Sequence, residues 1–367
     1  MEIAVIGGGI VGAALTYWLA RAGAKVTLYE AAEPGQGTSG ASFAWLNASN
    51  KPPRAYHDLN AAGMAEHAGL ARECAGDNWA HFTGGLHWSA TPAGRERLGD
   101  LAAHLNAWDY PVEVMTPAQA MELEPGLALD PEEIEQVWYT PGEGWADAPL
   151  LIRTVLARAG ELGAVVRTHA AVTAIEAAGG RVTGLRLATD EVVGVDAAVN
   201  CAGPRTAEVA ALAGVTLPVG RAPGLLAVTA PVEPCGRVVC HADNIYFRPE
   251  PAGGLVLGHA DDLDATVTAE TPRTPPPPAC AELLNRATRY RPAVTVAGLA
   301  AARIGVRPMP ADGLTIAGLL PSYANFYVAV THSGVTLGPL LGRLVAETII
   351  SGAAPAQLAP FTPNRFA

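Results

Sequence analysis

Three glycines near the start of the chain, Gly7, Gly9 and Gly12, stand in the spacing G-x-G-x-x-G. In this spacing the first glycine permits a tight turn, the second lets the backbone approach a pyrophosphate, and the third lets a helix pack closely on a strand. Glu30 follows where a carboxylate accepts hydrogen bonds from the hydroxyls of an adenosine ribose. The pattern predicts a dinucleotide-binding site. Its alternative is a glycine-rich turn that holds no ligand.

The segments around these glycines supply the elements that such a site needs. Residues 2–7 are an apolar run that predicts a strand, residues 10–21 predict a helix that stops at Gly23, and residues 25–29 predict a second strand. The free N–H groups at the start of the helix would face the phosphates. This strand–turn–helix–strand unit suits both FAD and NAD, so other segments have to decide between them.

Two later segments repeat the pattern of a buried strand that runs into a glycine turn. The first ends in residues 200–204, and the second comprises a strand at 325–330, a glycine loop at 331–339 and a helix at 340–351. The start of a helix stabilises negative charge, such as that on the N1–C2=O edge of a reduced flavin. Several segments therefore point to a long cofactor with two chemically different ends, which favours FAD over NAD.

The segment after Glu30 is also suited to a cofactor. Residues 34–42 are rich in glycine and small hydroxyl residues, so their N–H and O–H groups can face a phosphate chain, although an ordinary surface loop is the alternative. Residues 43–47 are more apolar than a surface loop, and we expect them to enter the interior beside the ligand. Further helices are predicted at 52–72, 116–122, 146–162 and 279–290, and strands at 84–88, within 165–200 and within 217–257.

Composition and charge exclude several classes of protein. A chain of 367 residues, half of them hydrophobic, can bury the cores of two domains. The net charge of −11 argues against a partner that is a nucleic acid or an anionic membrane. Met1 leads directly into the first strand and no apolar stretch reaches the length of a membrane span, so we expect a cytoplasmic protein without a transmembrane segment. The five cysteines are scattered without C-x-x-C spacing, which predicts buried free thiols, no disulfide framework and no metal site.

Along nearly its whole length the chain resembles the D-amino-acid oxidase superfamily of flavoproteins, which includes glycine oxidase, sarcosine oxidase and D-amino-acid dehydrogenase. The order and spacing of several short motifs carry the resemblance. They are residues 7–12, 37–42, 144–147, 200–204, 246–249 with 254–258, 305–309 with 312–313, and 331–334.

The resemblance implies an α/β fold (α+β overall), with a Rossmann-like FAD-binding domain and a second, antiparallel-sheet substrate domain, the glutathione-reductase-2-like FAD fold. It implies a discontinuous FAD-binding domain of residues 1–50, 145–215 and 300–367, and a substrate-binding domain of residues 51–144 and 216–299. The residues expected to contact noncovalent FAD are Gly7, Gly9, Ile10, Val11, Gly12, Glu30, Ser39, Ser42, Val172, Ala202, Gly203, Arg307, His332, Ser333, Gly334 and Val335.

Two residues are expected to act on the substrate. In glycine-oxidase-like members the arginine of a G-x-R-P motif binds the substrate carboxylate, and here that residue is Arg307. Its planar fork of N–H donors matches a carboxylate. The alternative is a structural ion pair, with Asp312 as the candidate partner. Tyr246 occupies the sheet position whose phenol orients the substrate, and its alternative is a core tyrosine.

Two departures from the family pattern refine these expectations. Sarcosine oxidase attaches its flavin to a cysteine where this chain has Arg307, so the covalent link should be absent. Sarcosine oxidase also carries a lysine that promotes reaction with oxygen, and its counterpart here is Val256. The electron acceptor is therefore left open between O₂ and another molecule.

The function implied is oxidation of the C–N bond of a small amino or imino acid, by hydride transfer to flavin N5, to an imine that hydrolyses. One alternative is an FAD-dependent 2-hydroxy-acid dehydrogenase, for which His241 is the only histidine that could serve as the base. The other is a flavin-binding subunit without turnover. Four further residues could line the pocket, but we expect each on the solvated surface: His241, His57, Lys51 and Arg54.

Overall fold

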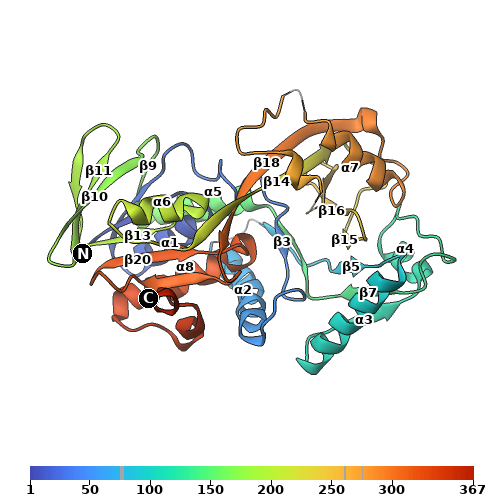
Figure 1. The fold of residues 1–367 in the computed structure, drawn as a ribbon, viewed down its shortest axis with the longest axis horizontal. Coiled ribbons are helices and arrows are strands. Elements are labelled where there is room, and N and C mark those ends of the chain that lie inside the picture. The colour runs from blue at the N-terminus through green and yellow to red at the C-terminus, as the bar shows by residue number, and fades with distance from the viewer. Residues whose placement is uncertain (75–77, 260–261, 275) are drawn as a thin grey trace.

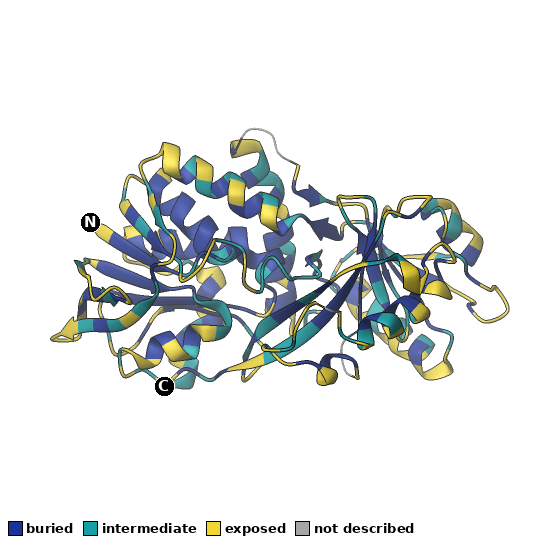
Figure 2. Cartoon of the chain, turned by 90° about the horizontal axis from the view of Figure 1, so that it is seen from above, coloured by how far each residue is buried: buried dark blue, intermediate teal, exposed yellow. Residues whose placement is uncertain are grey.

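The computed structural model describes residues 1–74, 78–259, 262–274 and 276–367 of the chain. Two large β-sheets lie at opposite ends of an elongated molecule, and the long strands β14 (Val219–Thr229) and β18 (Leu299–Pro310) run between them (Figure 1). The strands and helices near the middle of the molecule are mostly buried, and exposed residues gather on the outer helices and loop tips (Figure 2).

The first large sheet carries the glycine turns. Its six strands lie in the order β19 (Ile316–Leu319), β20 (Phe326–Val330), β13 (Ala197–Asn200), β1 (Glu2–Ile6), β2 (Lys25–Tyr29) and β9 (Val165–Arg167). All neighbours are parallel except β19 and β20. The strands β1, β13 and β20 are almost wholly buried, as expected for a parallel sheet covered on both faces.

Three helices share a core with this sheet: α1 (Ile10–Arg21), α5 (Ala148–Glu161) and α8 (Gly334–Ser351). Asp147 caps α5, because its carboxylate accepts a hydrogen bond from the Leu150 N–H at 2.9 Å. The helix α2 (Arg54–Glu73) packs on α8 so tightly that a Cβ on Gly63 would lie 2.7 Å from the Thr336 carbonyl oxygen.

The helix α8 begins at Gly334, six residues before the start at Leu340 that the sequence predicted. Pro339 therefore lies inside the helix, where its missing N–H leaves the Val335 carbonyl without its helical partner. His67 of α2 supplies the bond instead, from Nε2 to the Val335 oxygen at 2.8 Å. Trp79 Nε1 donates to His67 Nδ1 at 3.3 Å, which leaves the proton on Nε2. A buried histidine thus makes the proline tolerable in the helix.

The second large sheet has eight strands. Their order is β18, β14, β17 (Leu255–Gly258), β16 (Tyr246–Pro249), β15 (Val239–His241), β5 (Gly85–His87), β7 (Val137–Thr140) and β6 (Glu113–Met115). All neighbours are antiparallel except β15 and β5. The helix α7 (Ala279–Thr288) buries its apolar face on this sheet, in a core that includes Leu225, Phe247 and Leu257.

Smaller elements complete the fold. One three-stranded sheet contains β10 (Val172–Ala178), β11 (Arg181–Leu187) and β12 (Val192–Gly194), and another contains β3 (Trp45–Leu46), β8 (Gly144–Ala146) and β4 (Ala80–His81). The remaining α-helices are α3 (Pro92–Ala107), α4 (Pro117–Leu123) and α6 (Thr206–Ala211). Short 3₁₀ helices cover Gly203–Arg205, Asp264–Thr266, Val296–Gly298, Ala356–Phe361 and Pro363–Phe366.

The predicted division into two domains stays a prediction, but two of its boundaries differ from the packing. The strand β18 pairs with β14 from Leu299 to Pro310 and so belongs to the eight-stranded sheet, although residues from 300 onward were assigned to the FAD-binding domain. The helix α2 shares its core with α1 and α8, although residues 51–144 were assigned to the substrate domain. Both differences arise because the position of an element in the sequence does not show which sheet or core it packs in.

Cys235 is exposed, whereas the sequence predicted that the cysteines are buried; Cys74, Cys201, Cys240 and Cys280 are buried free thiols. Cys235 follows a bend at Pro234 and lies outside any helix or strand. The alternation of apolar residues that predicts burial in regular elements is therefore missing there. None of the helices within the described ranges combines the length and apolarity that crossing a bilayer requires.

The bond between His67 and Val335 can be tested through Pro339. His67→Phe should lower the free energy of unfolding by about 1–3 kcal/mol, because it leaves the buried Val335 carbonyl without a donor. In a Pro339→Ala background the restored N–H of residue 339 can bond the same oxygen, so His67→Phe should cost less there. Urea unfolding of the wild type, both single variants and the double variant measures the coupling. An equal cost in both backgrounds would show that His67 does not compensate for the proline.

Candidate active site

A cavity of about 470 Å³ lies where the two large sheets meet. Its walls come from residues within 9–11 at the start of α1, 38–51 around β3, 201–203 after β13, 224–226 of β14, 305–308 of β18, and 329–336 at the junction of β20 and α8, together with His241, Tyr246 and Asp264. Segments that are far apart in the sequence therefore meet around one space.

The glycine turn after β1 has the geometry that close backbone approach requires. Gly7 has φ of +108°, a conformation that side chains rarely adopt, and a Cβ there would lie 2.6 Å from the Cys201 carbonyl oxygen. A Cβ on Gly12 would lie 2.0 Å from the Gly7 carbonyl oxygen. The first and third glycines are thus required by the turn and by the packing of α1 on β1 and β13.

Two helix starts open on the cavity. The N-cap residues of α1 and α8, Gly9 and Ser333, make no side-chain capping bond of their own. At α1, Ser39 Oγ accepts a hydrogen bond from the Ile10 N–H at 3.1 Å and so holds the loop 34–42 against the helix start. Because uncapped helix starts favour anions, the cavity offers two sites for negative charge.

Glu30 is held in place by the turn that it follows. Its Oε2 accepts a hydrogen bond from the Gly8 N–H at 2.7 Å, and its Oε1 accepts one from the Ala32 N–H at 2.9 Å. Each carboxylate oxygen has a further lone pair, so Glu30 can still accept hydrogen bonds from ribose hydroxyls. These contacts fix its orientation beside the glycine turn.

The loop that enters α8 is tied to other elements by hydroxyl groups. Tyr56 of α2 donates from its OH group to Ser333 Oγ at 3.0 Å. Thr315 donates to Thr331 Oγ1 at 2.9 Å, and Thr336 donates to the Trp45 carbonyl oxygen at 3.0 Å. These bonds position the N–H groups at the start of α8 relative to β3.

The buried Arg248 holds the cavity-lining residue Phe43 in place. It donates hydrogen bonds to the Phe43 and Pro249 carbonyl oxygens, and its guanidinium lies 5.0 Å from the centre of the Trp145 ring. Burial lowers its pKa to about 10, which Glu250 opposes. Arg248 therefore stays charged at neutral pH and fixes the loop residue Phe43, whose ring meets the ring of Tyr246 edge-on at 4.6 Å.

Aromatic rings form one side of the cavity. The ring of His241 lies 4.1 Å from that of Trp45 and 5.5 Å from that of Tyr246, and it stacks on His87 at 5.0 Å with an angle of 7° between the planes. Burial holds the pKa of His241 well below its usual value, and the charge of His87 would lower it further. His241 is therefore a neutral group at physiological pH.

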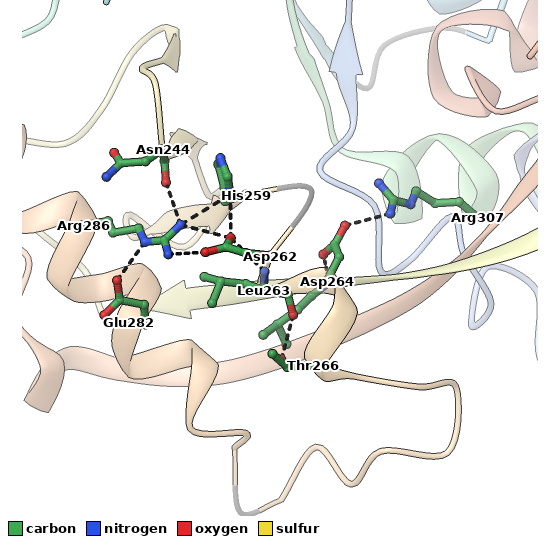
Figure 3. A network of polar contacts seen from close by, with 10 residues as sticks. Asn244, His259, Asp262, Leu263, Asp264, Thr266, Glu282, Arg286 and Arg307 are labelled. Carbon is green, nitrogen blue, oxygen red and sulfur yellow. Dashed lines mark hydrogen bonds and ion pairs between the residues drawn. The ribbon is translucent and has the colours of Figure 1, made fainter. Parts of the chain in front are cut away.

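Arg307 faces the cavity but is already paired. Its Nη2 donates to Asp264 Oδ2 at 2.7 Å and to the Pro223 carbonyl oxygen at 3.0 Å, and the side chain is 31% exposed (Figure 3). Asp264 also accepts a hydrogen bond from the Leu225 N–H at 2.8 Å. The sequence suggested Asp312 as an ion-pair partner of Arg307, which is wrong, because Asp312 binds Arg365 at 2.7 Å.

Most of the residues expected from the sequence line this cavity. They are Gly9, Ile10, Val11, Ser39, Ser42, Gly203, Tyr246, Arg307, His332, Ser333, Gly334 and Val335. The others expected at the cofactor lie outside the cavity wall. They are Gly7, Gly12, Glu30, Val172 and Ala202, of which the first three shape the turn after β1. The individual role of each residue stays a prediction.

Sequence reasoning misplaced three residues and missed a fourth. His241 and Lys51 line the cavity and His57 is buried, although all three were expected on the solvated surface. Arg54, also expected there, has a side chain that is 51% exposed. Asp264 was not considered, because nothing in its local sequence marks it as the partner of an arginine 43 residues away.

Comparison with known proteins defines the class to which this fold and cavity belong. The sequence model of the family described as FAD dependent oxidoreductase matches residues 2–348. The chain therefore belongs to this family, and the predicted family, fold class and FAD cofactor are confirmed. The uncapped starts of α1 and α8 and the glycine turn fit the two ends of FAD.

Particular relatives match over the whole chain. The chain is 30% identical to glycine oxidase of Geobacillus kaustophilus (strain HTA426), over 99% of this chain and 97% of the relative. It is 27% identical to D-amino acid dehydrogenase of Methylobacterium sp. (strain 4-46), over 95% of each chain. The crystal structure of glycine oxidase from Geobacillus kaustophilus superposes with a TM-score of 0.88 at 26% identity, over 99% of this chain and 98% of that one.

The mode of FAD attachment can be checked directly. Because Arg307 stands where sarcosine oxidase has its flavin-linked cysteine, acid precipitation should release all the yellow colour into the supernatant. Chromatography of the supernatant should identify intact FAD. Colour that stays with the precipitated protein would instead show a covalent bond.

Proposed function

We propose that the protein oxidises the C–N bond of a small amino or imino acid to an imine, which water then hydrolyses. The chemistry that bound FAD supplies is acceptance of a hydride at flavin N5. The observation that carries the proposal is the guanidinium of Arg307, which faces a cavity that has aromatic rings on one side and also contains the starts of α1 and α8 in its wall. The names of the relatives, glycine oxidase and D-amino acid dehydrogenase, support an amino-acid substrate.

Arg307 would bind the substrate carboxylate. Asp264 and the Pro223 carbonyl both accept from Nη2, whereas Nη1 has no hydrogen bond within the described residues. A substrate carboxylate could therefore bind at Nη1, while Asp264 holds Nη2 in place. Tyr246, on β16 of the same sheet, would orient the remainder of the substrate.

The cavity is suited to a substrate amine that binds in its neutral form. Burial lowers the pKa of His332 to about 4, and the charges of Lys51 and Arg307 lower it further. His241 is also neutral. An amine nitrogen with a free lone pair can expel the α-hydrogen as hydride without a strong base, so these neutral groups are compatible with the proposed reaction.

One observation favours a second candidate, oxidation of a 2-hydroxy acid. The Nε2 atom of His241 is buried and has no hydrogen-bond partner among the described residues, so it could accept the proton of a carbinol. Anaerobic bleaching of the flavin band by hydroxy acids, and not by amino acids of either configuration, would establish this alternative in place of the first.

The role of Arg307 gives the test of the proposal. Arg307→Ala should lower kcat/KM for an amino acid by roughly 30- to several-thousand-fold, because it removes a charge-assisted contact worth about 2–5 kcal/mol. Arg307→Lys should recover only part of this loss. Anaerobic bleaching is compared between an amino acid and its carboxamide. Wild type should prefer the acid, and the alanine variant should lose most of that preference.

Two controls keep this result specific to the carboxylate. The flavin spectrum of Arg307→Ala should be nearly that of the wild type, which shows that FAD still binds. The exposed Arg221→Ala variant, altered on the neighbouring strand β14, should keep the acid preference. Unchanged discrimination against the carboxamide in Arg307→Ala would exclude Arg307 as the carboxylate anchor.

The electron acceptor can be approached through Val256. This residue is fully buried in β17, opposite Arg248, and it is not part of the cavity wall. Since it replaces the oxygen-activating lysine, we infer slow reoxidation of the reduced flavin by O₂ and faster reoxidation by an artificial acceptor. Stopped-flow mixing of the reduced enzyme with air-saturated buffer measures the rate. Reoxidation as rapid as that of an efficient oxidase would contradict this inference.

A further inference from the structure

Lys51 contributes a second cation to the cavity wall. It is one of only two lysines in the chain, and it lies between the buried residues 47–49 and the start of α2. The segment is fixed on both sides, because the N–H groups of Ala48 and Ser49 donate to Glu143 Oε1 and the Ala48 carbonyl accepts from His57 Nδ1 at 2.8 Å. Lys51 is therefore held at this place by a rigid backbone.

Glu143, whose negative charge acts on Lys51, is not its hydrogen-bond partner within the described residues. Glu143 is fully buried, and its Oε1 accepts from Ala48 N, Ser49 N and Tyr110 OH at 2.8–3.0 Å. Its Oε2 accepts from Thr140 Oγ1 at 3.1 Å. Within the described residues, Lys51 has neither a hydrogen bond nor an ion pair, although the charge of Glu143 favours its protonated form.

The two cations of the cavity differ in how they are balanced. Arg307 has Asp264 as a direct partner, whereas Lys51 is influenced by the charge of Glu143 without an ion pair within the described residues. The charges of both cations lower the pKa of His332. His332 is therefore neutral and adds no charge to the cavity wall. Burial lowers the pKa of Lys51 to about 8. Because this value is above 7, the ammonium group remains mostly charged at neutral pH.

Because buried charges in proteins are normally paired, an unpaired ammonium group on a cavity wall is free to bind an anionic group. We propose that Lys51 binds a second carboxylate of the substrate, so that the enzyme prefers amino or imino acids with two carboxylates. This inference rests on the proposed function, in which Arg307 binds the first carboxylate. The aromatic rings of Trp45, His241 and Tyr246 would enclose the carbon chain between the two acids.

The test compares substrates that differ in one carboxylate. Aspartate and asparagine, glutamate and glutamine (each in both configurations), and iminodiacetate and N-methylglycine are mixed anaerobically with the FAD-loaded enzyme. The apparent dissociation constant and the bleaching rate are then measured separately. Wild type should bind the diacid of a reactive pair roughly ten- to hundred-fold more tightly than its partner, the range expected for a charge-assisted bond to a buried group.

Substitution of Lys51 should remove this preference. In Lys51→Met the ratio of dissociation constants should fall to near one, and Lys51→Arg should keep part of the preference. The other lysine supplies a matched control, because Lys25 has a side chain that is 80% exposed and Lys25→Met should behave as wild type. An unchanged ratio in Lys51→Met would overturn the proposal.

A second readout does not require turnover. Because the chain has two lysines, labelling of amines with trinitrobenzenesulfonate, followed by peptide mass spectrometry, reports Lys51 separately from Lys25. Malonate should protect Lys51 and not Lys25, whereas acetate at the same concentration should protect neither. Failure of every amino acid to bleach the flavin would refute the proposed function. Equal labelling of Lys51 in malonate and acetate would refute the role of Lys51, whatever the result of the bleaching.

Discussion

The close approach of helices α1 and α8 is the constraint on which the cavity depends. A Cβ on Gly342 would lie 2.7 Å from the backbone of Ala14 and Leu15, and one on Gly338 would lie 2.9 Å from Ile10. Glycine at these positions lets the two backbones meet. Because the helices are in contact near their starts, the N–H groups of both point into one space. The pyrophosphate of FAD and the N1–C2=O edge of a reduced flavin could then be served by two helices from opposite ends of the chain.

The long strands β14 and β18 connect this cofactor space to the second sheet. Thr38, in the loop after β2, donates a hydrogen bond to the Val306 carbonyl oxygen, so β18 is attached to the phosphate-facing loop. Gly305 permits this, since a Cβ there would lie 3.0 Å from the Ala41 carbonyl oxygen. Arg307 is two residues further along β18. Its position relative to the loop 34–42 is therefore fixed by the same backbone contacts.

Electrostatic balance distinguishes the two parts of the cavity. The cofactor end relies on helix starts and backbone N–H groups, which carry partial charges and need no counterion. The other end uses full charges: Asp264 pairs with Arg307, and the negative charge of Glu143 favours the protonated form of Lys51. The neutral histidines His241 and His332 add no charge there. A substrate carboxylate therefore meets a region whose positive charge is only partly compensated.

The sequence alone determined the local units, because their signals are short in range. Residues 2–30 fold as predicted, with the strand, the glycine turn, the helix and the second strand in place, since each is specified by neighbouring residues. The family and the FAD cofactor followed from motifs of the same kind, and most of the site residues expected from them line the cavity.

The tertiary structure decided everything that depends on distant partners. The helix α8 continues through Pro339 because His67, more than 250 residues away, replaces the missing hydrogen bond. Arg307 pairs with Asp264 and not with the nearby Asp312, because β14 brings the 3₁₀ turn at Asp264 beside β18. Lys51 and His241 look like surface residues in their local sequence, yet both line the cavity. A side chain's solvent exposure and its charge partner depend on which elements pack against it, and that information is not contained in any short stretch of the chain.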